Sequence, residues 1–61
     1  MNWELYEVWT VTEDGHEELF DTTKSLKEAK TMAKKALTDG VIECIIYKDE
    51  DGELYEVESI Q

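Results

Sequence analysis

Apolar and polar residues alternate near both ends of this chain, whereas its middle follows a helical period. Residues 2–12 are rich in Trp, Tyr, Val and Thr, which favour strands, and they lead into TEDGH, where Gly15 can adopt the positive φ of a hairpin turn. Residues 16–22, HEELFDT, are typical of a short, charged second strand. The segments 41–48, VIECIIYK, and 53–60, ELYEVESI, flank a similar acidic turn, DEDGE. The pattern therefore predicts two β-hairpins, one toward each end of the chain.

The segment between the hairpins predicts one amphipathic helix. Ser25 is the expected N-cap, and Glu28 completes an S-x-x-E capping box. Asp39-Gly40 is the expected end, with Gly40 as the left-handed residue after the last turn. The apolar residues recur at helical spacing and form one stripe, with Met32 at its edge: Leu26, Ala29, Ala33, Ala36 and Leu37. The element order is ββαββ, so we expect an α+β fold in a single domain over residues 1–61.

The hydrophobic pattern also predicts the order of the strands. The first and third strands are apolar on both faces and should be central, whereas the second and fourth are short or charged, as natural edge strands are. The order 2-1-3-4 meets both conditions and makes every neighbouring pair antiparallel. One helix covers one face of such a sheet, and we expect these residues beneath it: Tyr6, Val8, Ile42, Cys44 and Ile46.

The face without a helix is the most informative feature of the sequence. A small antiparallel sheet normally has one dry face and one wet face. Here the second face is also apolar, with Glu7 in its midst: Trp3, Leu5, Trp9, Val11, Val41, Ile45 and Tyr47. Such a row is too large and too apolar for ordinary surface. It predicts a face that binds a partner or a second copy, and the candidate residues are Trp3, Leu5, Trp9, Val11, Ile45 and Tyr47.

Charge is segregated along the chain. Sixteen acidic and six basic residues give a formal net charge of −10. Within residues 24–35 five lysines stand against one glutamate, which gives +4 and leaves −14 for the rest of the chain. Direct nucleic-acid or membrane binding is not expected, because both use basic surfaces. The predicted acidic surface lies at the two turns: Glu13, Asp14, Asp49, Glu50 and Asp51. Two roles stay open for it, namely solubility with edge protection, or docking on a basic groove of a partner.

The acidic turns are weak candidates for metal binding. If Gly52 took the fixed glycine of an EF-hand loop, Asp49, Asp51 and Glu58 would fall on ligand positions, but the flanking segments predict strands rather than helices. His16 lies beside the other turn with no second His or Cys nearby. An acidic hairpin turn is the better interpretation, and no metal is expected.

Catalytic chemistry is equally weakly indicated. Cys44 is the only cysteine, so no intramolecular disulfide forms, and among isoleucines its thiol behaves as a small hydrophobe. Ser25 is explained as a cap, Ser59 has no His nearby, and the three glycines form no phosphate-binding loop. We therefore expect a protein without catalytic activity or cofactor. The lone thiol and the start MNWELYE, which is no secretory signal, favour the cytoplasm.

The layout resembles a group of small phage and bacterial accessory proteins that includes some anti-CRISPR inhibitors. The resemblance rests on YEVWTV, on the helix start SLKEAK and on the closing IIYKDEDGELYEV. It implies a stoichiometric binder in the cytoplasm of a bacterial host, and it assigns no functional residue. A chain of 61 residues is marginal as an independent fold, so partnering is the leading source of extra stability. Two hypotheses stay open: a protein-binding module, including an inhibitor that occupies a basic or nucleic-acid-binding surface, and a structural homodimer that packs through its aromatic sheet face.

Overall fold

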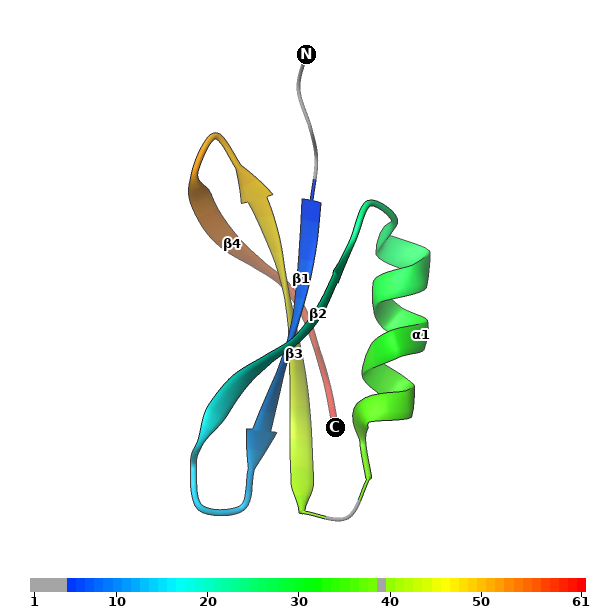
Figure 1. Cartoon of the computed structure of the whole chain (residues 1–61), viewed down its shortest axis with the longest axis vertical. Helices are drawn as coiled ribbons and strands as arrows, with labels where there is room; N and C mark the ends of the chain where they lie inside the picture. The colour runs from blue at the N-terminus through cyan, green and yellow to red at the C-terminus, as the bar shows by residue number, and fades with distance from the viewer. Residues whose placement is uncertain (1–4, 39) are drawn as a thin grey trace.

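Four antiparallel strands and one helix make up the fold (Figure 1). The computed structural model describes residues 5–38 and 40–61. The elements in chain order are β1 (Leu5–Thr12), β2 (Glu17–Thr23), α1 (Leu26–Ala36), β3 (Val41–Glu50) and β4 (Glu53–Ile60). The sheet order is β2-β1-β3-β4, and each neighbouring pair is antiparallel. The predicted ββαββ fold and its strand order are confirmed.

Both hairpin turns use backbone conformations that favour glycine. At the β3–β4 turn, Asp51 and Gly52 have φ of 54° and 83°, and Glu50 pairs with Glu53 across them. Two successive residues with positive φ are the pattern of a type I′ hairpin, whose twist matches that of the strands it joins. At the β1–β2 turn, Gly15 has φ of 87°. The two acidic turns of the sequence are therefore hairpin turns.

The start of α1 is capped more elaborately than its sequence motif predicts. Ser25 is the N-cap, and its hydroxyl accepts the Glu28 N–H at 3.4 Å. The Glu28 carboxylate instead accepts the hydroxyl of Thr23 at 2.7 Å, and the Thr23 hydroxyl accepts the Ser25 N–H at 3.4 Å. Because Thr23 is buried at the end of β2, this relay ties the helix start to the sheet.

The end of α1 differs from the prediction. The helix ends at Ala36 with Leu37 as its C-cap, whose N–H donates to the Ala33 carbonyl at 3.2 Å. Gly40 has a positive φ of 89°, but it lies three residues beyond the cap, directly before β3. The expectation that Asp39-Gly40 ends the helix was therefore wrong for Gly40, while Asp39 lies outside the described residues. The left-handed glycine redirects the chain into β3 rather than closing the last helical turn.

The core is small and lies between α1 and the central strands. Three alanines of the helix face three residues of the sheet, and all six are buried: Ala29, Ala33, Ala36, Val8, Cys44 and Ile46. Larger apolar side chains surround this cluster and are only partly buried: Tyr6, Leu26, Met32, Leu37, Val41 and Ile60. Alanines on the buried side of a helix let its backbone approach the sheet closely, and the core therefore needs few large side chains.

One irregularity at the start of β3 corrects the predicted faces. Val11 pairs with Glu43 and Thr12 pairs with Val41, so Ile42 is an extra residue in a bulge. Ile42 is 52% exposed, whereas Val41 packs against the core. The expectations that Ile42 lies beneath the helix and Val41 on the opposite face were therefore wrong. A bulge shifts the alternation of side chains by one residue, and strict alternation was assumed.

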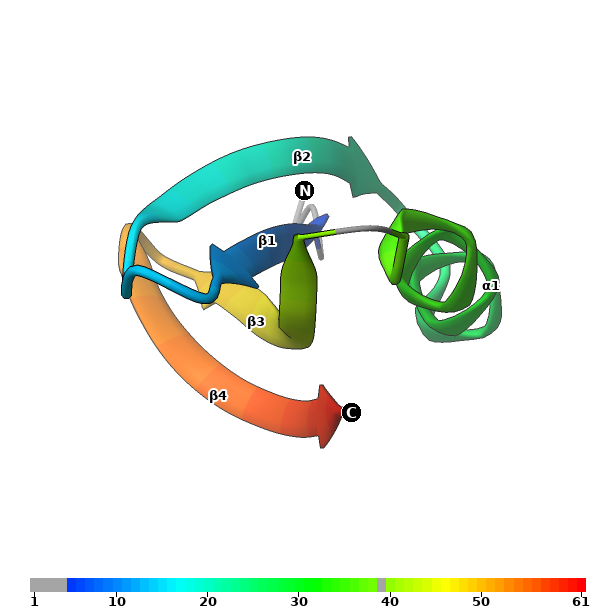
Figure 2. The same cartoon turned by 90° about the horizontal axis from the view of Figure 1, so that it is seen from below.

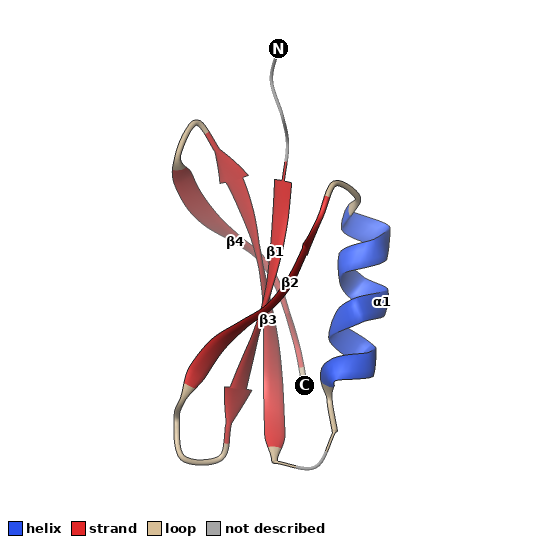
Figure 3. Ribbon diagram, in the orientation of Figure 1, coloured by secondary structure: helices blue, strands red, loops and turns tan. Residues whose placement is uncertain are grey.

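The sheet is strongly twisted, and its edge strands curve around the central pair (Figure 2). The β1–β2 pairing shifts register between Val8 and Trp9, and the β3–β4 pairing shifts between Ile46 and Tyr47. Bulges of this kind increase local twist. Both hairpin turns lie on the side of the sheet away from α1, at opposite ends of the molecule (Figures 1 and 3). Within residues 5–38 and 40–61, strand ends and turns therefore frame the helix-free side, and no helix or further strand covers it.

Candidate binding face

The helix-free side of the sheet, here called the open face, is the strongest candidate for a functional surface. The β1–β3 register places Trp9 opposite Ile45 and Glu7 opposite Tyr47. Residues at alternate positions share a face, so the central strands present one continuous set. Its members are Leu5, Glu7, Trp9, Val11, Glu43, Ile45, Tyr47 and Asp49.

The predicted partner-binding residues come together on this face. Leu5, Trp9, Val11, Ile45 and Tyr47 all stand on it, and each is partly buried. The sixth predicted residue, Trp3, lies outside the described residues. The structure thus brings the described candidates into one surface between the two edge strands.

An aromatic pair forms the centre of the open face. The rings of Trp9 and Tyr47 meet edge to face, with centroids 6.3 Å apart and an angle of 87° between their planes. The Trp9 indole N–H donates to Glu7 Oε1 at 2.9 Å. This bond explains how a carboxylate is accommodated in an apolar row: Glu7 satisfies the indole and fixes its orientation.

Beside the aromatic pair lies a shallow hollow to which all four strands contribute. Its volume is about 300 Å³, and it is lined by Trp9, Glu17, Tyr47 and Leu54. Glu17 comes from β2 and Leu54 from β4. Both edge strands curve around the central pair (Figure 2), which agrees with the place of these two residues beside Trp9 and Tyr47. The sequence pattern does not assign Glu17 or Leu54 to this face. Their side depends on the strand register and on bulges in both edge strands, and a pattern of alternation does not reveal either.

Carboxylates surround the aromatic centre. Glu56 stands opposite Tyr47 on β4, and Glu43 accepts hydrogen bonds from the Ser59 hydroxyl and, at 3.3 Å, from the Gln61 amide. Burial raises the pKa of the Tyr47 hydroxyl, and the neighbouring carboxylates of Glu17, Glu56 and Glu43 raise it further. The contribution of these carboxylates to the rise in pKa is that of a negative electrostatic potential at the centre of the open face.

The basic residues lie elsewhere. All six are lysines, and none stands at an open-face position of a strand. Five belong to residues 24–35 in or just before α1, and Lys30 forms an ion pair with Glu58 at 3.2 Å. Lys48 pairs with Tyr6, which packs against the helix-side core, so Lys48 also stands on that side. The molecule therefore has a basic helix layer and an acidic, aromatic sheet face.

The predicted acidic surface is divided between two places. Glu13 and Asp14 belong to the β1–β2 turn. Glu50, the last residue of β3, and Asp51 lie at the β3–β4 turn, at the opposite end of the long axis (Figure 1). Asp49 stands opposite Leu5 at the edge of the open face. The acidic residues thus lie at both ends of the open face rather than in one patch.

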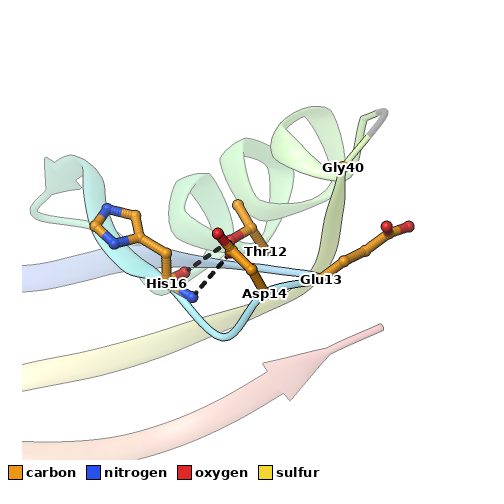
Figure 4. A pocket seen from close by; sticks show the side chains of 5 residues that line it. All are labelled: Thr12, Glu13, Asp14, His16 and Gly40. Carbon is orange, nitrogen blue, oxygen red and sulfur yellow. Dashed lines mark hydrogen bonds between the residues drawn. The ribbon is translucent and has the colours of Figure 1, made fainter.

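A second hollow, of about 440 Å³, lies between the β1–β2 turn and the start of β3 (Figure 4). The Asp14 carboxylate accepts the Thr12 hydroxyl and, at 3.3 Å, the His16 N–H, and these bonds lower its pKa. The side chains of Glu13 and His16 point away from each other (Figure 4). The Asp14 carboxylate stabilises the turn, and the polar side chains that line this hollow do not point toward a common position.

The groups considered for calcium binding are separated. Asp49 stands on the open face, whereas Glu58 pairs with Ile46 on the helix side and contacts Lys30. Among residues 5–38 and 40–61, no cluster of three or more His, Cys, Asp or Glu residues could hold a metal ion. Burial raises the pKa of the Cys44 thiol, which keeps this thiol protonated in the core. The helix described in the structure is not long and apolar enough to cross a membrane.

No protein-family model, curated protein or solved structure matches this chain. The resemblance to small phage and bacterial accessory proteins therefore stays a prediction.

Proposed function

We propose that this chain is a non-catalytic protein-binding module whose open face docks on a basic surface of a partner protein, such as a nucleic-acid-binding groove. One observation carries this proposal. The two aromatic rings at the centre of the open face are surrounded by carboxylates, and no lysine stands among them. Trp and Tyr are common anchors of protein interfaces, and a surrounding rim of one charge selects a partner of the opposite charge.

The charge of the face favours a basic partner over a second copy of the chain. A two-fold pairing of open faces would bring like carboxylates together from both copies: Glu7, Glu17, Glu43, Asp49 and Glu56. Like charges across an interface cost several kcal/mol unless cations intervene, and this face supplies none. The net charge of −10 adds to the repulsion. The structural homodimer is therefore the weaker of the two hypotheses.

The test compares two aromatic side chains on opposite sides of the sheet. Tyr55 pairs with Lys48, stands on the helix side and is 51% exposed. Wild type, Trp9→Ala and Tyr55→Ala would each be used for quantitative affinity capture from the source cells, and retained proteins would be purified. We expect a partner that wild type and Tyr55→Ala retain and that Trp9→Ala loses. A partner retained equally by all three variants would contradict a role for the open face.

Kinetics with the purified partner sharpen the test. Trp9→Ala should speed dissociation, because apolar contact holds the complex together. Neutralising Asp49, Glu50 and Asp51 with Asn, Gln and Asn should slow association and flatten its dependence on salt, since exposed charges act over about 8 Å at physiological ionic strength. If this triple variant associates at the wild-type rate in low salt, the acidic ends contribute to solubility and not to docking.

Sedimentation of the chain alone at high concentration tests the structural homodimer. A dimer that is lost in Trp9→Ala would support that hypothesis.

A further inference from the structure

The hollow of the open face has a lining that selects for a particular ligand group. Its walls are two aromatic rings, one aliphatic side chain and one carboxylate, from Trp9, Tyr47, Leu54 and Glu17. The edge-to-face geometry of the rings forms a corner rather than a flat stack. Such a corner accommodates a flat or elongated group beside the rings, with its polar end at the carboxylate.

The carboxylates around the hollow accept hydrogen bonds, and the Tyr47 hydroxyl can both donate and accept. The indole N–H of Trp9 is already donated to Glu7 at 2.9 Å. Glu17, Glu56 and Glu43 act on Tyr47 as negative neighbours, and their carboxylate oxygens are acceptors. A ligand that complements these groups must bring donors and positive charge, together with a surface that packs on aromatic rings.

Resting on the proposed function, we propose that the hollow receives an arginine side chain of the basic partner. A guanidinium is planar, weakly hydrated and always charged, so it stacks on an aromatic face while donating two parallel hydrogen bonds to one carboxylate. Trp9 and Tyr47 supply the rings, and Glu17 supplies the carboxylate. A lysine ammonium is a compact, strongly hydrated point charge, and it uses this combination less well.

The volume and position of the hollow agree with a single inserted side chain. A hollow of about 300 Å³ is at the lower end of the range for small-ligand pockets, and it lies among all four strands rather than at an end of the sheet. Leu54 borders it and can contact the aliphatic part of an arginine, as apolar surfaces do for long cationic side chains. The carboxylates at the ends of the open face then attract the rest of the basic segment.

The experiment uses defined peptides and needs no identified partner. The full wild-type chain is titrated with capped peptides of alternating Gly and Arg, and with matched Gly-Lys and Gly-Glu peptides. Chemical shifts of the backbone amides and of the Trp9 indole N–H report binding and its location. We expect the Arg peptide to bind several-fold more tightly than the Lys peptide and to shift amides around Trp9 and Tyr47. The Glu peptide should not bind.

Two adjacent glutamates provide a matched pair of variants. Glu17 lines the hollow, whereas Glu18 pairs with Thr10 on the helix side and lies 4.0 Å from His16. Glu17→Gln and Glu18→Gln change the net charge equally. We expect Glu17→Gln to weaken Arg-peptide binding about tenfold, as the loss of one charge-assisted contact does, and Glu18→Gln to leave it within about twofold. Tyr47→Ala should weaken it at least as much as Glu17→Gln.

The outcomes separate this proposal from the proposed function. Equal affinity for the Arg and Lys peptides, or equal effects of the two glutamine variants, would show attraction by net charge alone and overturn the arginine site. Absence of Arg-peptide binding at millimolar concentration would also overturn it. If Trp9→Ala still releases a captured partner in either case, the open face binds that partner without an arginine in the hollow. If Trp9→Ala has no effect on capture, the proposed function fails as well.

Discussion

The two faces of the sheet differ in composition and in burial, although the same central strands supply both. On the face covered by α1, Val8, Cys44 and Ile46 are fully buried against alanines. On the open face, the larger side chains of Trp9 and Tyr47 are only partly buried and lie among carboxylates. The covered face is small and dry, and the open face is large, aromatic and acidic.

This difference separates the residues that form the core from the aromatic residues that stand outside it. Aromatic side chains contribute the most apolar area per residue, roughly 150–250 Å² each, so a marginal domain gains most by burying them. This chain instead builds its described core from alanine, valine, cysteine and isoleucine. Trp9, the largest described side chain, stands on the open face and is only partly buried, which agrees with the proposed docking of a partner there.

The largest effect should separate two adjacent isoleucines. Ile46 is fully buried beneath α1, whereas Ile45 stands on the open face opposite Trp9 and is partly buried. Ile46→Ala should lower the free energy of unfolding by about 2–5 kcal/mol, the usual loss for a fully buried isoleucine. That is a large part of the total stability of a domain of this size. Urea denaturation followed by circular dichroism measures both variants.

Ile45→Ala is the matched control, and we expect it to cost about 1 kcal/mol, because much of its side chain keeps contact with water. Equal losses for the two variants would mean that the open face is packed as tightly as the core. The contrast between the faces would then be wrong, and the open face would be structural.

The sequence predicts the strand order and the aromatic centre of the open face, but it fails at a bulge. The strand order follows from the two-sided apolar pattern of β1 and β3, because a strand apolar on both sides must be central. The same pattern identifies Trp9 and Tyr47 as members of the open face. It fails at Val41 and Ile42, where the bulge reverses the faces of the two residues.

The edge strands show why the remaining part of the site is not predictable from the pattern. Glu17 and Leu54 reach the hollow because β2 and β4 twist and curve over the central pair. The twist depends on bulges near Phe20 and Val57, which interrupt the pairing of β2 and β4 with the central strands. Both residues are apolar in charged strands, and nothing in their types marks them as unpaired. Register is a tertiary property, and the local sequence does not encode it alone.

A smaller effect should separate two adjacent threonines at the end of β2. The Thr23 hydroxyl connects the Ser25 N–H to the Glu28 carboxylate beneath the covered face, whereas Thr22 is exposed opposite Glu7 on the open face. Thr23→Val keeps the shape of the side chain but removes both hydrogen bonds, and it should lower the free energy of unfolding by about 1–2 kcal/mol. Thr22→Val should change it by less than about 0.5 kcal/mol. Thermal and urea unfolding measure both variants, and a neutral Thr23→Val would show that water replaces the relay.

The smallest effect concerns alkaline pH and the electrostatics of the open face. The folded protein holds the pKa of Tyr47 above its ordinary value of 10.0, through burial and then through Glu17, Glu56 and Glu43. Below that value the hydroxyl is protonated in both the folded and unfolded states, so its contribution to stability is complete. As pH rises past it, the unfolded chain loses the proton first, binds fewer protons than the folded chain, and becomes favoured. Stability should therefore fall through the alkaline range more steeply in wild type than in Tyr47→Phe, because the lysines and the other tyrosines titrate in both proteins.

Urea denaturation from about pH 9 to about pH 11, with tyrosinate absorbance as a parallel probe, measures this difference between wild type and Tyr47→Phe. Glu17→Gln should reduce it in part, since one of the negative neighbours is then neutral. If wild type and Tyr47→Phe lose stability in parallel, the carboxylates do not act on the aromatic centre, and the negative potential attributed to the open face is wrong.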